Sequence, residues 1–293
     1  MSEPVKSLAD HAISYKMSVA PFNPTKTMKE IREATAQQFG CAPKRTTGTV
    51  YLLEDQFTEP LVEQVRRIRK FFELYTLKLG DIDIIPSMNF WRVSEFVQTT
   101  VPVFDTLKQE FVDKWESDIK PQSKASLAKL GIILEAKQTA IFKLTPEQVA
   151  DRIYFKFTKT VMADPNAVRN LRGVSEDLQK SMEVDLRAQY KAVEGRAHEQ
   201  LELRLREVLS KFVGKMKTYK GDGNRMHETI ITNIGELVDL VPDMLVGDHP
   251  ELLTVCNEAK LLTNWDVDLL KDNESARKEA CQTAEGILNK MKF

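Results

Sequence analysis

The longest uninterrupted helical pattern in this chain extends from Val174 to Tyr219 and contains no proline. Apolar side chains recur in it every three or four residues, the interval that places side chains on one face of a helix. The run predicts one helix of about 70 Å, longer than a compact domain is wide. Its apolar stripe must therefore be covered by several other elements or by another chain. The residues expected to make this contact are Leu186, Tyr190, Val193, Leu201, Leu205 and Phe212.

The composition is that of a globular protein, because 42% of the 293 residues are hydrophobic and 29% are charged. The three cysteines, Cys41, Cys256 and Cys281, are far apart and form no C-x-x-C pair. They predict neither a disulfide framework nor a zinc site, and we expect them to be buried small side chains. The N-terminal residues lack the apolar core of a signal peptide, and no stretch approaches the length of a membrane span. We therefore expect a cytoplasmic protein that makes no membrane contact.

The charge is unevenly distributed along the chain. Residues from Asp222 to Phe293 include fourteen Asp and Glu against seven Lys and Arg, which gives that segment a charge of −7. Residues 1–221 must then carry +6, because the total is −1. Such polarity predicts either contact between two copies or docking of the two parts within one chain.

The fold class expected from these patterns is mainly α: an elongated helical bundle with one very long helix and a minor β element. The chain divides by pattern into four consecutive regions. They are an irregular N-terminal region with a short helix and strand (1–57), a helical hairpin region with a small sheet (58–163), the long helix (164–221) and an acidic helical region (222–293).

The first two regions contain several local signals. A short helix is expected at 27–39, and the β-branched and bulky residues at 49–53 predict a strand. Thr58, Glu59 and Pro60 predict a helix start, with Gly80 as its stop. An extended segment then reaches Pro86.

A second long helix is expected from Trp91 to Ile119, bent near Pro102 and followed by Pro121. Together with the helix before it, this segment predicts an antiparallel helical hairpin. Farther along, Thr145 to Gln148 has the form of a capping box. The alternating residues at 153–158 fit a strand and a helix equally well.

Breaks frame the long helix, with Gly173 before it and a turn at 220–224 after it. Three shorter helices are expected beyond that turn. They span 225–240, 249–262 and 273–291.

The motifs of common catalysts are absent from the sequence, including the P-loop, the complete G-x-G-x-x-G, G-x-S-x-G and H-E-x-x-H. His198 lies four residues from both Glu194 and Glu202, but solvated charges on a helix are a commoner explanation of this spacing than a metal site. Asp81 and Asp83 are more simply the polar edge of an extended segment. We therefore expect no catalytic residue, no metal and no cofactor.

Two basic clusters are the best indication of a binding surface. If they meet in space they could hold phosphates, with Tyr75 or Tyr219 stacking on bases. The simpler explanation is that basic side chains near a helix C-terminus complement its dipole. The residues of the two clusters are Arg66, Arg67, Arg69 and Lys70, and Arg204, Arg206, Lys211 and Lys215.

Residues 65–115 resemble part of a helical family found in bacteriophages and mobile elements. In that family a helix ends in a Y-x-T-L-like turn with glycine, an extended piece reaches a proline, and an aromatic residue opens the next helix. Matching positions here are Tyr75, Thr76, Leu77, Gly80, Pro86, Trp91, Phe104, Phe111 and Trp115. The resemblance implies a companion of MoxR-type AAA+ ATPases, and so an adaptor in the host cytosol.

The sequence as a whole predicts a non-enzymatic interaction or assembly protein, an adaptor or scaffold that binds a protein partner or forms a homo-oligomer, as coiled coils do. A nucleic-acid-binding accessory factor that uses the basic clusters is the first alternative. An enzyme whose residues come from distant parts of the chain is the second.

Overall fold

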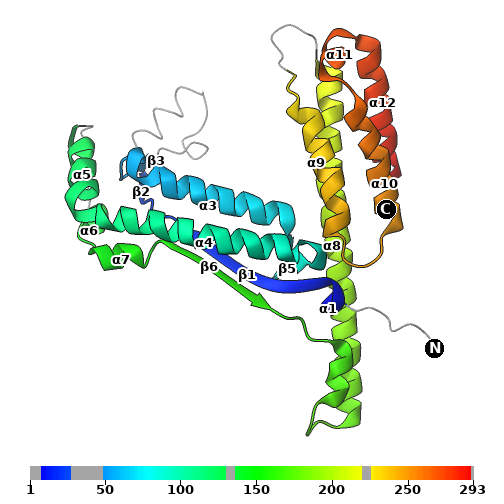
Figure 1. Cartoon of the computed structure of the whole chain (residues 1–293), viewed down its shortest axis with the longest axis horizontal. Helices are drawn as coiled ribbons and strands as arrows, with labels where there is room; N and C mark the ends of the chain where they lie inside the picture. Colours follow the sequence, from blue (N-terminus) through cyan, green and yellow to red (C-terminus); the bar gives the residue numbers. More distant parts are fainter. Residues whose placement is uncertain (1–7, 28–48, 130–135, 220–225, 292–293) are drawn as a thin grey trace. The chain divides into compact units, whose positions relative to one another are not determined.

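The structure is a computed structural model that describes residues 8–27, 49–129, 136–219 and 226–291. It confirms the predicted fold class, mainly α with one very long helix and a minor β element (Figure 1). The described strands form a four-stranded sheet, in the order β4 (Leu77–Leu79), β5 (Ile82–Pro86), β1 (Ala12–Ala20) and β6 (Tyr154–Thr160), and a separate pair of β2 (Thr25–Thr27) and β3 (Thr49–Tyr51). The predicted helix at 27–39, Cys41 and the turn at 220–224 lie outside the described residues, apart from the first residue of that helix.

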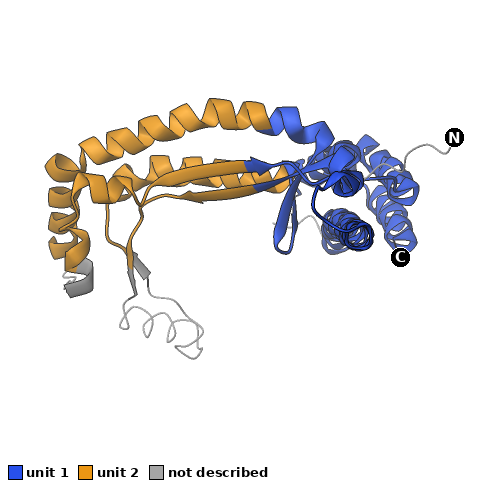
Figure 2. Ribbon diagram, turned by 90° about the horizontal axis from the view of Figure 1, so that it is seen from below, with its two compact units in different colours: residues 1–15, 75–93, 159–293 blue, residues 16–74, 94–158 orange. Residues whose placement is uncertain are grey.

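The chain forms two compact units, each assembled from stretches that are separate in the sequence (Figure 2). Unit 1 contains Met1–Tyr15, Tyr75–Val93 and Lys159–Phe293, and unit 2 contains Lys16–Leu74 and Ser94–Thr158. The four consecutive regions expected from the sequence stay a prediction.

Unit 2 is built on two helices, α3 (Asp55–Tyr75) and α4 (Phe90–Asp113), the second of which begins in unit 1. The rings of Phe71 and Phe96 stack with centroids 3.6 Å apart, and Gln56 Nε2 donates to Gln122 Oε1. The end of α3 thus lies by the start of α4, as the predicted antiparallel hairpin requires. The helix begins at Asp55 rather than at Thr58, so Pro60 falls in its second turn.

The predicted helix end before Pro121 is wrong. After α4 the chain makes a π-helical turn, η3 (Trp115–Ile119), and continues as α5 (Lys120–Lys129). Pro121 lies in the first turn of α5, where a proline is tolerated. The wide π turn changes the hydrogen-bond register ahead of this residue, as the bond from Ile119 N to Lys114 O shows.

The remaining elements of unit 2 are short. Strand β2 (Thr25–Thr27) pairs with β3 (Thr49–Tyr51), which confirms the predicted strand there. Helix α6 spans Ala136–Ile141, and the Thr145 capping box opens α7 (Pro146–Ala150) as predicted. The segment that fitted strand and helix equally is a strand, β6 (Tyr154–Thr160).

Unit 1 is organised around α8 (Glu176–Thr218), which confirms the predicted long helix. Ser175 caps its N-terminus by accepting from Leu178 N, and Gly173 just before it has a φ of 79°. The shorter helices confirm the three predicted ones with small shifts at their ends. Helix α9 (Thr229–Met244) corresponds to the first. Helix α10 (Pro250–Lys260) with the 3-10 turn η5 (Leu261–Asn264) corresponds to the second, and α12 (Glu274–Lys290) to the third. The short helix α11 (Val267–Asp272) was not predicted.

Strands β4 and β5 follow the end of α3 in the chain, whereas β1 lies near the N-terminus and continues from unit 1 into unit 2. Helix α1 (Leu8–His11) leads into β1 (Ala12–Ala20), which pairs antiparallel with β5 (Ile82–Pro86). Strand β4 (Leu77–Leu79) pairs with β5 through a turn at Gly80, whose φ is +74°. Gly80 is therefore a hairpin-turn residue and not the predicted helix stop, since α3 ends at Tyr75.

Polar side chains of α8 satisfy the backbone of β4. Gln200 pairs with both the N–H and the carbonyl of Lys78, each at 3.2 Å. Four residues to either side, Arg196 donates to Leu79 O and Arg204 donates to Thr76 O. This side of β4 is therefore covered by helix side chains, which protects a strand edge from pairing with another chain.

Candidate functional site

Most of the apolar stripe on α8 is buried within the chain itself. Val193, Leu201, Leu205 and Phe212 are at most 1% exposed, and Tyr190 is 9% exposed. They belong to one core with residues of α9, α10 and α12, which lie along the C-terminal part of α8 in Figure 1. The five residues are therefore covered by other elements of unit 1, the first of the two alternatives that the stripe predicted.

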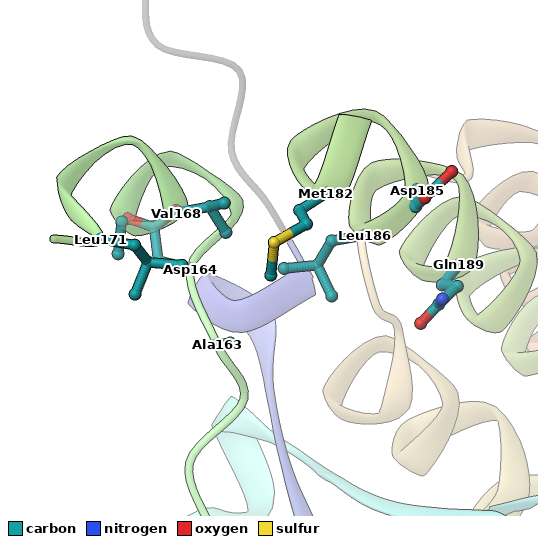
Figure 3. Close-up of a pocket in the computed structure, with 9 residues that line it drawn as sticks. Ala163, Asp164, Val168, Leu171, Met182, Asp185, Leu186 and Gln189 are labelled. Atoms are coloured by element: carbon teal, nitrogen blue, oxygen red, sulfur yellow. The ribbon is translucent and has the colours of Figure 1, made fainter. Parts of the chain in front are cut away.

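The N-terminal turns of α8 differ, because their apolar side chains remain partly uncovered. Leu178 is 53% exposed and Met182 is 40% exposed, and Leu171 in the segment before α8 is 42% exposed. An open groove of about 530 Å³ lies here (Figure 3). Its lining residues are Ala163, Asp164, Ala167, Val168, Leu171, Met182, Asp185, Leu186 and Gln189.

One wall of the groove is the 3-10 helix η4 (Pro165–Asn170) with the residues on each side of it. Asp164 caps η4 by accepting from Asn166 N at 2.8 Å, and Pro165 occupies the first helical position. Val168 then faces α8, from which Met182 and Leu186 project toward it (Figure 3). Of the predicted stripe residues, Leu186 is the one that lines the groove.

A carboxylate on α8 ties this wall in place. Glu183 is 7% exposed, and its carboxylate accepts from Arg169 Nε at 2.7 Å and from Arg169 Nη2 at 2.9 Å. Arg187 donates to the same carboxylate and, through Nη2, to Asn166 Oδ1 at 2.7 Å. The hydrogen bonds from Arg169 and then from Arg187 lower the pKa of Glu183 to about 2, so the carboxylate stays ionised.

Two further hydrogen bonds hold the ends of the wall. Tyr190 Oη donates to Ala163 O at 2.6 Å, and Gln179 Nε2 donates to Leu171 O at 2.8 Å. Burial is the main reason that the pKa of Tyr190 is raised, so its hydroxyl keeps the proton that it donates. The backbone on both sides of η4 is thus attached to α8.

The charged side chains that line the groove are both acidic. Asp164 and Asp185 are carboxylates, and Lys, Arg and His are absent from the lining residues. The guanidinium groups of Arg169 and Arg187 pair with Glu183, and Arg172 is exposed directly after the lining residue Leu171. An apolar groove with an acidic rim is the result.

The basic clusters fall in different units, one on α3 and one on α8. On α3, Arg66 pairs with Glu63 and Glu59, and Arg69 donates to Val19 O at 3.1 Å. Arg67 and Lys70 are exposed on the same helix.

On α8 the predicted nucleic-acid ligands make contacts within unit 1. Arg204 donates to Thr76 O and Arg206 donates to Met291 O. Lys211 pairs with Glu207 at 2.7 Å, and Lys215 lies 5.9 Å from the centre of the Tyr219 ring. Two of these four side chains therefore donate to backbone carbonyls of the fold.

The histidine near Glu194 and Glu202 is part of a helix-capping arrangement. His198 Nε2 lies 2.7 Å from Val246 O, and its ring meets the ring of His249 at 4.6 Å. His249 accepts from Leu252 N and so caps α10, while its Nε2 lies 3.4 Å from Glu202. Burial is the main cause of the lowered pKa of His198. Within the described ranges, no three His, Cys, Asp or Glu side chains gather in a way that could hold a metal ion.

Cys256 and Cys281 are buried, as predicted. Burial raises the pKa of the Cys256 thiol to about 11 and raises that of Cys281 as well, so both are poor nucleophiles.

The groove was not predicted from the sequence. The signal that could have indicated its first wall is Asp164-Pro165 followed by Val168 and Leu171, a short amphipathic turn placed just before the break at Gly173. Which face of α8 this turn would contact depends on the tertiary structure.

Comparison with protein-family profiles, curated proteins and solved structures finds no match for this chain. The resemblance of residues 65–115 to a bacteriophage family therefore stays a prediction. Among the helices of the described ranges, none combines the length and the apolar character that crossing a bilayer demands.

Proposed function

We propose that this protein is a non-enzymatic interaction protein, an adaptor or scaffold, that docks a segment of another protein in the groove between η4 and α8. The observation that supports the proposal is a groove in which Leu171 and Met182 stay 42% and 40% exposed, and whose η4 wall is held by hydrogen bonds from Arg169, Arg187, Tyr190 and Gln179. Exposed apolar surface that is already shaped and bordered by polar groups is typical of protein-binding sites.

The resemblance at residues 65–115 suggests the class of protein that would be bound. A MoxR-type AAA+ ATPase is the partner that it implies, in a host cytosol. The sequence has no P-loop, so the chain would be a companion of such a motor and not the motor itself.

Site-specific photo-crosslinking tests the docking role. A photoreactive amino acid is placed at position 182, which lines the groove, or at position 184, where Val184 is 65% exposed on the same helix outside the groove. We expect a discrete crosslinked protein from position 182 in host cells and none from position 184. Equal patterns from the two positions would contradict docking in the groove.

Self-association through the same surface is a special case of this proposal. It predicts a dimer or larger species by light scattering at tens of micromolar, and its loss on Met182→Glu, because a charge would enter an apolar contact. A strict monomer would eliminate the oligomer and leave the adaptor role.

A second candidate, nucleic-acid binding, is favoured by the exposed Arg67 and Lys70 on α3. Arg204 and Arg206 are poor choices for its test because they donate to backbone carbonyls of the fold. An electrophoretic shift assay at low salt should show weaker binding for Arg67→Glu with Lys70→Glu, and binding of the original chain should fall steeply with salt. The absence of any retarded DNA or RNA would eliminate this candidate.

A further inference from the structure

The groove is shaped by two helical walls and offers no strand edge. One wall is the 3-10 helix η4, and the other is the face of α8 that carries Met182, Leu186 and Gln189 at helical spacing. An extended peptide is usually bound by adding it to a strand edge, where its backbone groups find partners. Here the carbonyls beside the groove already accept from Tyr190 and Gln179.

A segment that pairs its own backbone groups is therefore favoured in this apolar groove, which has no free strand edge to pair them. Unpaired backbone groups are costly away from water, and a helix pairs them internally. An amphipathic helix could lay its apolar side chains between Val168 and Met182 in the manner of helix-in-groove recognition. A volume of about 530 Å³ suits the side chains of such a helix rather than its backbone.

The rim determines the charge of the segment. Asp164 and Asp185 border the groove, and the guanidinium groups of Arg169 and Arg187 already donate to Glu183. A lysine or arginine beside the apolar face of the bound helix would meet these carboxylates, whereas an acidic residue would be repelled.

The same rim disfavours a second copy of this chain. An isologous contact places a patch against itself, so the acidic rim of one copy would face the acidic rim of the other. Since no lining residue is basic, that contact would bring the carboxylates of Asp164 and Asp185 in the two copies toward each other. A different partner with the opposite charge fits the groove better.

From these observations we infer that the occupant of the groove, given the docking function proposed above, is an amphipathic helix of another protein whose apolar face is flanked by lysine or arginine. Met182 and Leu186 contact its apolar side chains, and Asp185 contacts its basic flank. Asp164 adds to the negative potential while it caps η4.

Selection from a displayed library of random peptides tests this inference. Peptides that bind the original chain are kept, and those that also bind the Met182→Glu variant are removed. The surviving peptides therefore depend on the groove for binding. We expect survivors with apolar residues at helical spacing and lysine or arginine beside them. Circular dichroism of each variant shows whether α8 and its surroundings remain folded.

The affinities of the synthesised survivors then separate the contributions. We expect Met182→Glu to weaken binding by about tenfold or more, because a carboxylate would be buried against apolar groups. Asp185→Lys should weaken it by roughly threefold to fivefold, with less effect at high salt, as for an exposed ion pair. The matched control is Glu199→Lys, the same charge change at an exposed site of α8 outside the groove, which should leave the affinity unchanged.

The remaining outcomes distinguish the inference from the proposed function. Survivors that depend on Met182 but lack basic residues, or that are extended and proline-rich, would overturn the inference and leave the docking function standing. If the original chain self-associates and the Met182→Glu variant does not, a second copy occupies the groove. That result would also overturn the inference. If no selected peptide depends on Met182, both the inference and the docking function fail.

Discussion

The guanidinium of Arg169 donates two hydrogen bonds to the carboxylate of Glu183, at 2.7 Å from Nε and at 2.9 Å from Nη2. This two-point contact joins η4 to α8 with a fixed orientation, because the planar guanidinium matches both carboxylate oxygens. It lies beside the groove and holds the wall that carries Val168 and Leu171. The shape of the groove therefore depends on a residue that does not line it.

Replacing Glu183 with Gln should loosen this wall while leaving the rest of α8 folded. An amide can accept from Arg169 at one oxygen only, and it removes the negative charge that attracts both arginines. Hydrogen exchange measured by mass spectrometry should show faster exchange in residues 164–171. Glu199→Gln, at an exposed position of the same helix, is the control and should leave that exchange unchanged. Equal protection in the two variants would contradict the role of Glu183.

The contribution of Glu183 should also depend on pH with a defined sign. Its pKa is lowered from 4.5 to about 2, first by the hydrogen bond from Arg169, so the folded state favours the ionised form. The stabilisation is complete above about 4.5 and is lost as the pH falls through about 2. The difference in protection between the original chain and Glu183→Gln should therefore shrink across this window. A difference that persists at its acid end would refute the assignment.

Phe212→Ala should destabilise the core of unit 1 strongly. The ring is fully buried among residues of the C-terminal helices, and its removal leaves a cavity. We expect a loss of about 3–5 kcal/mol in the free energy of unfolding, measured by urea titration. Leu203→Ala is the matched control on the same helix, since Leu203 is 58% exposed and should change stability by less than about 0.5 kcal/mol. Similar losses in the two variants would show that the core is placed wrongly.

Two glycines of unit 1 should respond in opposite directions to alanine. Gly195 lies in the interior of α8, where an added Cβ would meet nothing within 4 Å. Gly195→Ala should therefore stabilise the protein by about 0.5–1 kcal/mol. Gly247 has a φ of +75°, and its Cβ would lie 1.8 Å from Glu194 Oε1.

Even if the Glu194 side chain moves away, Gly247→Ala should cost about 1–2 kcal/mol, because an L-residue is strained in the left-handed region. Thermal unfolding of both variants gives the comparison. Stabilisation by both substitutions would contradict the backbone conformation at Gly247.

Patterns that involve neighbouring residues were readable from the sequence. The long helix, its start after the break at Gly173, and the capping box at Thr145 are governed by side chains a few positions apart. The same is true of the three C-terminal helices. Errors arose where an alternative local signal existed, as at Gly80, which suits a helix stop and a hairpin turn equally.

Patterns that involve distant residues were not readable. Arg196, Gln200 and Arg204 contact the backbone of residues 76–79 across more than 115 residues of sequence, and nothing in their spacing distinguishes them from polar side chains on a helix surface. The same limitation led to the prediction of Arg204 as a nucleic-acid ligand. Burial of Glu183 likewise required the placement of η4.

The amino-acid sequence alone predicted one long helix between Val174 and Tyr219, which is α8 (Glu176–Thr218), because helix hydrogen bonds and the apolar period are local properties. Only the tertiary structure decided which parts of its apolar face are covered. Packing buries the face from Tyr190 to Phe212 and leaves Leu178 and Met182 partly open. The physical reason is that burial is set by which other segments meet the helix, and those contacts are made between residues far apart in the chain.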